Sequence, residues 1–189
     1  MWFDSHCHLH ICEQETTLNG LVERAETAGV HAILTLGTDV ATSHRSVAIA
    51  HRDGIYAGVG VHPNDAAVWS TEVAEEIEAL LSDEHVVALG ETGLDFYRDE
   101  VPVDIQRAAF SAHIAMSKRH DKALVIHTRN SAPEALDVLE SEGAPARLVF
   151  HCWSGDEAEP PEHFRSCAAE DIRAPDFVFR ERELITITS

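Results

Sequence analysis

Short apolar runs alternate along this chain with longer stretches in which apolar residues recur at helical spacing. The runs are typical of buried strands and lie near residues 2–3, 32–36, 55–61, 86–89, 124–126 and 148–150. Between them, apolar residues three or four positions apart predict amphipathic helices within residues 18–28, 73–81 and 105–112. The first of these helical patterns stops at Gly29.

The predicted strands begin about 25–35 residues apart, which is the size of one βαβ unit. Parallel strands joined by right-handed helical crossovers follow from that spacing. The sequence therefore predicts an α/β protein, and spacing alone leaves open whether the sheet is open or closed into a barrel.

Composition narrows the class of protein. The chain has 189 residues, 44% of them hydrophobic, and a formal net charge of -19, which indicates a globular rather than a disordered protein. No apolar run reaches 18 residues, and the first residues lack the pattern of a signal peptide, so we expect neither a membrane span nor secretion. The four cysteines form no CxxC pair and indicate reduced thiols in a cytoplasmic protein.

The charge balance also limits the mode of nucleic-acid binding. Broad binding to a phosphate backbone depends on many Lys and Arg side chains, and Lys118 and Lys122 are the only lysines of the sequence. We therefore do not expect a sequence-independent clamp along duplex DNA. A site where metal ions supply the positive charge for one phosphate group stays open.

Residues of metal-ligand type follow five of the six predicted strands. They are Asp4, His6, His8, His62, Glu91, His127 and His151. In parallel α/β proteins the active site lies at the carboxyl ends of the strands, where the loops converge. We therefore expect these side chains to meet.

The spacing of these residues indicates a transition-metal centre. His6 and His8 stand two positions apart, which places both imidazoles on one side of an extended strand. Imidazoles with one carboxylate suit Zn, Mn, Fe, Ni or Co better than Ca. Glu91 is the expected bridge between two ions, which would activate a water and hold the oxygens of a phosphodiester.

Five motifs in order carry a family resemblance: DSHCHL at 4–9, GVHP at 60–63, GETGLDFY at 90–97, IHTR at 126–129 and HCWSG at 151–155. With them the chain resembles the TatD family of metal-dependent deoxyribonucleases, within the amidohydrolase superfamily. The resemblance implies a TIM (β/α)8-type barrel and a cytoplasmic enzyme with a divalent-metal centre. It also implies hydrolysis of DNA, commonly as a 3′-to-5′ exonuclease on single strands or ends.

The resemblance assigns the metal ligands. His6 and His8 would bind one ion, Glu91 would bridge, and His127 and His151 would bind the second. It implies two divalent ions, which could be Mg, Mn or Zn. DNA is the implied partner, and no obligate protein partner or membrane is expected.

Four further residues have expected positions or roles. The resemblance implies that His62 contacts the substrate phosphate or assists the leaving group as a catalytic residue beside Glu91. Asp95 is expected to orient a metal ligand, with a plain turn residue as the alternative. Arg129 would pair with a phosphate oxygen, with a helix-capping or surface role as the alternative. His10 is expected to be a loop histidine beyond the strand end.

The pattern of strands and helices stops after Asp156. We therefore divide the chain into a hydrolase barrel, residues 1–155, and an atypical tail, residues 156–189. Only 38 residues follow His151, whereas two further βα units need about 60. The expected barrel is incomplete, with about six recognisable strands and the last two units missing from a truncated or altered C-terminus.

The closing motif of the resembled family, Glu-Thr-Asp before a small residue and Pro, is absent. In that family its aspartate ligates a metal and takes a proton from the attacking water. Asp156, Asp171 and Asp176 are the candidates to replace it, and we expect that none does.

Three functions are consistent with these observations. The first is a TatD-type deoxyribonuclease. The second is a non-catalytic metal-binding remnant, which the missing aspartate favours. The third is an amidohydrolase acting on another ester or amide, against which the segment GLDFY at 93–97 argues.

Overall fold

The computed structural model describes residues 2–13, 16–98 and 100–151 of the chain. The predicted tail and its three candidate aspartates lie outside the described residues. Six strands form one parallel sheet in the order of the sequence. They are β1 (Trp2–Cys7), β2 (Val30–Leu36), β3 (Ile55–Val59), β4 (Val86–Asp95), β5 (Ala123–Arg129) and β6 (Leu148–His151).

Helical segments connect these strands. They are α1 (Leu9–Cys12), α2 (Leu18–Thr27), α3 (Val40–Ala50), the 3-10 helix η1 (Pro63–Val68), α4 (Thr71–Leu80), α5 (Val103–His120) and α6 (Ala132–Glu142). The periodic stretches predicted from the sequence correspond to α2, α4 and α5. Helix α3 escaped prediction because its buried face is built mostly of Ser and Ala. It begins at a capping box between Asp39 and Thr42.

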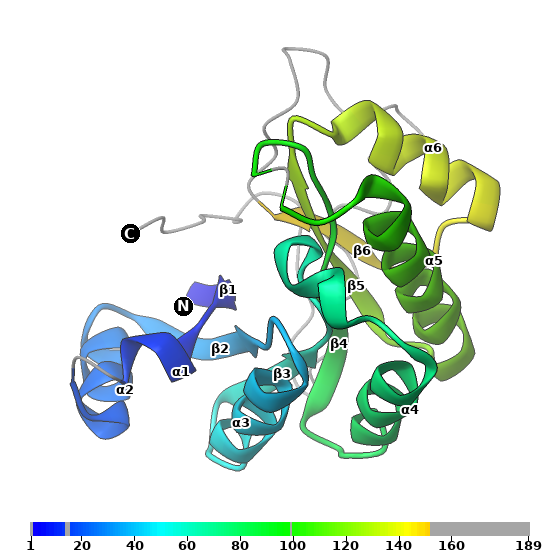
Figure 1. The fold of residues 1–189 in the computed structure, drawn as a ribbon. Helices are drawn as coiled ribbons and strands as arrows, with labels where there is room; N and C mark the ends of the chain where they lie inside the picture. Colours follow the sequence, from blue (N-terminus) through cyan, green and yellow to red (C-terminus); the bar gives the residue numbers. More distant parts are fainter. Residues whose placement is uncertain (1, 14–15, 99, 152–189) are drawn as a thin grey trace.

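The sheet is curved, and helices α3 to α6 pack along its outside (Figure 1). Along β5, Leu124 and Ile126 belong to the apolar layer shared with the helices, whereas Ala123 and Val125 belong to a second cluster inside the curve. Successive residues of a strand face opposite sides, so His127 continues the inner row. The arrangement confirms the expected partial (β/α) barrel.

The carboxyl ends of the first and last described strands approach each other. The rings of His6 on β1 and His151 on β6 stack with their centroids 3.4 Å apart. The curvature of six strands therefore suffices to bring both ends of the row of ligand residues together. Among the described residues, no helix has the length and apolar character needed to cross a membrane; the expected cytoplasmic location stays a prediction.

A buried histidine fastens α5 to the loop that carries His62. The backbone N–H of Val61 donates to Nε2 of His113, at 3.1 Å, and Nδ1 of His113 donates to the carbonyl of Ala109, at 2.7 Å. The ring also packs against Trp69, with centroids 5.0 Å apart. Because Nε2 accepts a hydrogen bond, this geometry requires the neutral imidazole.

Protonation of His113 should therefore destabilise the fold in acid. Complete burial lowers the pKa of His113 to about 4, against about 6.5 in an unfolded chain. Below pH 6.5 the imidazole of His113 binds a proton in the unfolded chain but not in the folded chain, and this difference favours unfolding. Stability from this group is present above that pH and lost as the pH falls towards 4, by about 2 kcal/mol between pH 7 and pH 5.

Urea unfolding of the wild type and of His113→Gln at pH 7 and pH 5 measures this effect. The variant should lose less stability on acidification than the wild type, by about that amount. The same pH dependence in both proteins would contradict the assignment.

Candidate metal centre

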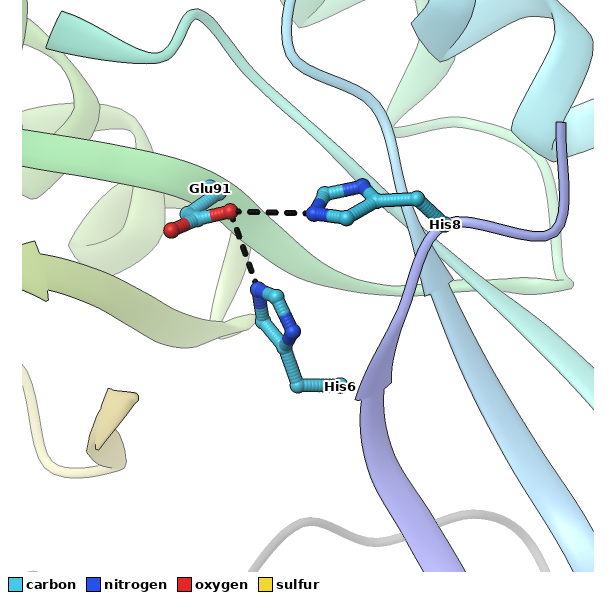
Figure 2. Close-up of side chains that lie close together, drawn as sticks. All are labelled: His6, His8 and Glu91. Carbon is cyan, nitrogen blue, oxygen red and sulfur yellow. Dashed lines mark hydrogen bonds and ion pairs between the residues drawn. The ribbon is translucent and has the colours of Figure 1, made fainter. Parts of the chain in front are cut away.

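The carboxylate of Glu91 on β4 is the centre of the site. Its side chain is buried, with the residue 3% exposed. Oε2 lies 2.9 Å from Nε2 of His6 and 3.3 Å from Nε2 of His8 (Figure 2). Oε1 lies 2.8 Å from Nδ1 of His127 and 3.8 Å from Nε2 of His62. Each oxygen of one carboxylate thus faces its own pair of imidazoles.

His6 and His8 reach Glu91 from the end of β1, as their spacing predicts (Figure 2). The two rings meet edge to face, with centroids 4.9 Å apart. Nδ1 of His8 lies 2.9 Å from the carbonyl oxygen of Leu36. A carbonyl oxygen only accepts hydrogen bonds, so Nδ1 carries a proton and Nε2 is the nitrogen that faces Glu91. This is the arrangement in which a backbone carbonyl orients a metal-binding histidine.

His127 lies between two carboxylates. Its Nδ1 faces Glu91, and its Nε2 lies 3.3 Å from Oδ2 of Asp95. Asp95 is itself held in place, because its Oδ1 accepts the backbone N–H groups of Tyr97 and Arg98. Asp95 ends β4 and contacts a predicted ligand, as an orienting residue would.

Asn64 is a residue that the sequence reasoning missed. Its side-chain amide donates to Oδ2 of Asp95, at 3.1 Å, and its backbone N–H donates to Nδ1 of His62, also at 3.1 Å. It therefore links His62 to Asp95, the carboxylate that contacts His127. Its position in η1, directly after His62 and Pro63, was the available signal.

The remaining candidates have distinct positions. His151 stacks on His6 and lies outside the two groups of ligand atoms around Glu91. The expectation that His10 lies in a loop is wrong: His10 is part of α1 and is 8% exposed. The guanidinium of Arg129 stacks over the ring of Tyr97, 3.7 Å from the centroid.

Two groups of ligand atoms share Glu91. One is His6, His8 and Glu91, and the other is His62, Glu91 and His127; within each group the atoms lie within 4.8 Å of one another. The second group contains His62 where the family resemblance led us to expect His151. The role of His151 as a ligand stays a prediction.

Burial and hydrogen bonding set the charges of the site. Burial by itself raises the pKa of Glu91, but hydrogen bonds from His127, His6 and His8 outweigh it and hold that pKa far below its usual range. Burial lowers the pKa of His62 to about 4, and burial together with the neighbouring His6 lowers that of His151 to about 4. Burial also lowers the pKa of His8, but its hydrogen bonds to Glu91 and to the Leu36 carbonyl outweigh burial and raise that pKa. Divalent metals bind ionised carboxylates and neutral imidazoles, so an ion at this centre would compete with protons.

A glycine on β4 allows the close approach that the site needs. Gly93 pairs with His127 across the sheet, at a φ of +140°. A Cβ at this position would lie 2.1 Å from the carbonyl oxygen of His127. Any side chain here would therefore push β5 away from β4 and move His127 away from Glu91.

This donor set fits a divalent transition metal. Nitrogen ligands with one carboxylate suit Zn or Mn, and within the described part of the chain neither a thiol nor a lysine belongs to the ligand groups around Glu91. The position at the carboxyl ends of the strands of a partial parallel barrel is where enzymes of this architecture bind their substrates. Fold and site together define the class of metal-dependent hydrolases.

The comparisons with known proteins identify the family. The model of TatD-related DNases matches residues 3–166, so the chain belongs to that family. It is 39% identical over 163 residues to the uncharacterized metal-dependent hydrolase TatD of Mycobacterium tuberculosis, covering 82% of this chain and 62% of the relative. It is 38% identical over 145 residues to the 3′-5′ ssDNA/RNA exonuclease TatD of Klebsiella pneumoniae, covering 75% of this chain and 55% of the relative.

A solved structure agrees with the fold. The crystal structure of YjjV, a TatD homologue from Escherichia coli, superposes with a TM-score of 0.74 at 27% identity, covering 82% of this chain and 61% of that one. The chain thus spans less than two thirds of the length of the relatives it matches.

If Glu91 is the shared ligand, its removal should abolish divalent-metal binding at this centre. We expect Glu91→Gln to weaken Mn²⁺ binding by at least about 100-fold, because even an outer hydrogen-bond partner of a ligand contributes 10–100-fold. Equilibrium dialysis with Mn²⁺ measures the change. Glu76→Gln is the matched control, since Glu76 is an exposed carboxylate 3.2 Å from a single imidazole, that of His44. Equal Mn²⁺ binding by both variants would contradict the assignment.

Proposed function

We propose that this chain hydrolyses phosphodiester bonds of single-stranded DNA from the 3′ end, using two divalent ions that share Glu91. The observation that carries the proposal is the pair of ligand groups, one on each oxygen of that carboxylate. Bound there, two ions would activate a water and hold the oxygens of the scissile phosphate. The name of the Klebsiella relative as a 3′-5′ ssDNA/RNA exonuclease supports the substrate and direction.

In this proposal the histidines divide between the two ions. His6 and His8 hold the first ion through the nitrogens that face Oε2 of Glu91. His127 holds the second, with His151 added as a ligand on the family resemblance, and Asp95 keeps the ring of His127 in place through Nε2. Mn²⁺, Mg²⁺ or Zn²⁺ could occupy the site, and the nitrogen-rich ligand set favours Mn²⁺ or Zn²⁺ over Mg²⁺.

His62 is positioned to donate a hydrogen bond. Its Nδ1 accepts the backbone N–H of Asn64, so the ring proton is on Nε2. Nε2 points towards Oε1 of Glu91, at 3.8 Å, which is too long for a strong hydrogen bond. We assign Nε2 of His62 to a phosphate oxygen or to the leaving oxygen of the substrate.

Arg129 and Tyr97 form an exposed surface next to this centre. Tyr97 is 60% exposed, and the guanidinium of Arg129 lies over its ring, 3.7 Å from the centroid. A stacked aromatic ring and guanidinium can bind a base and a phosphate of a single strand, and such stacking tolerates any sequence. This supports nucleic acid over an amide or lactone as the substrate.

The direct test is degradation of a labelled single strand by the 189-residue chain with Mn²⁺. A 5′-labelled strand should shorten in single-nucleotide steps, and a 3′-label should be released as a mononucleotide. EDTA and Glu91→Gln should each abolish the reaction, and Glu76→Gln should not. No loss of label from a Mn²⁺-loaded chain would instead support a metal-binding remnant, and hydrolysis of amides or lactones alone would support the third function.

The assignment of His62 has a separate test. His62→Gln should lower kcat by about 100-fold or more, the usual effect of removing a hydrogen-bond donor to the transition state, while the number of Mn²⁺ ions bound stays the same. Mn²⁺ dialysis and single-strand degradation on the same preparation measure both quantities. Loss of one Mn²⁺ equivalent would show that His62 is a ligand, as its place in the second group of atoms also allows.

A further inference from the structure

A third group of ligand residues lies at the opposite end of the strands from Glu91. His51 directly follows α3 and precedes β3, while Asp83 and His85 precede β4. Glu91 stands five residues beyond the first residue of β4, a distance of about 16 Å along an extended strand. This group is therefore separate from the centre described above.

One carboxylate again lies between two imidazoles. Oδ2 of Asp83 is 3.0 Å from Nε2 of His51, and Oδ1 is 3.1 Å from Nδ1 of His85. The two rings lie with their centroids 4.4 Å apart. One ligand atom from each residue falls within 4.8 Å of the other two, so a single ion between them can contact all three.

The local backbone holds this group in position. The backbone N–H of His85 donates to Oδ1 of Asp83, at 2.9 Å, and the N–H of Val86 donates to the carbonyl of Asp83. Lys122, the neighbouring cation, donates its ammonium group to the carbonyl of Val86. Besides the backbone N–H of His85, the Asp83 carboxylate contacts the two imidazoles. Side-chain exposures of 55% for His51 and 31% for His85 admit an ion from solvent.

We propose that His51, Asp83 and His85 form a second divalent-metal site, which takes Zn²⁺ or an ion of similar preference. Two imidazole nitrogens and one carboxylate oxygen are a common protein ligand set for Zn²⁺, with water in the fourth position. The site joins the segment between α3 and β3 to the segment between α4 and β4. An ion held there connects two neighbouring βα units and stabilises the folded chain.

The His44–Glu76 pair provides a matched control. It also joins α3 to α4 through one imidazole and one carboxylate, at 3.2 Å, with both side chains about half exposed. It belongs to none of the candidate metal groups among the described residues. The His44–Glu76 pair thus lacks one ligand of the proposed site, the second imidazole.

Equilibrium dialysis against Zn²⁺, followed by elemental analysis, tests the proposal. His51→Asn should bind one Zn²⁺ equivalent fewer than the wild type, and His44→Asn should bind the same number. Asp83→Asn should also lose one equivalent, although it keeps an oxygen to accept the N–H of His85. The increase in Tm on adding Zn²⁺ should be smaller in His51→Asn and Asp83→Asn than in His44→Asn.

The result does not depend on the role of Glu91, because only differences between variants with an intact Glu91 centre are compared. Equal Zn²⁺ content and equal Tm increase in His51→Asn and the wild type would overturn the proposal. Loss of an equivalent in His44→Asn as well would also overturn it, since any surface imidazole–carboxylate pair would then bind the ion.

Discussion

The structure of this site depends on an ionised carboxylate kept inside a protein. Burying a charge is unfavourable unless other groups replace the water that solvated it. For Glu91 those groups are imidazoles from β1 and β5, with His62 at a longer distance. Strands far apart in the sequence must therefore converge on one side chain, and a parallel barrel is an architecture that brings them there.

The rest of the fold holds these imidazoles in place. Gly93 allows β4 and β5 to approach closely at His127, and the Leu36 carbonyl orients His8. Asn64 connects His62 to Asp95, while His113 fastens the preceding residue to α5. The groups that orient His8, His62 and His127 are the Leu36 carbonyl, Asn64 and Asp95. None of these three groups is a proposed metal ligand. A site of this kind is preorganised before any ion binds.

The sequence predicted the strands and the meeting of four side chains at one site well, because both follow simple rules. Buried parallel strands are continuous apolar runs, and their carboxyl ends share one face, so His6, His8, Glu91 and His127 could be grouped without a structure. The same rules missed α3, whose buried face is built mostly of Ser and Ala, and placed His10 in a loop. They also missed Asn64, because a side chain that acts through hydrogen bonds across two loops leaves no periodic pattern.

Anomalous X-ray diffraction from crystals of the chain soaked in Mn²⁺ tests the central claim most directly. We expect two anomalous peaks about 3.5–4 Å apart, the spacing of two-metal hydrolytic sites, one at each oxygen of Glu91. A single peak, or peaks that do not contact the Glu91 carboxylate, would contradict the account.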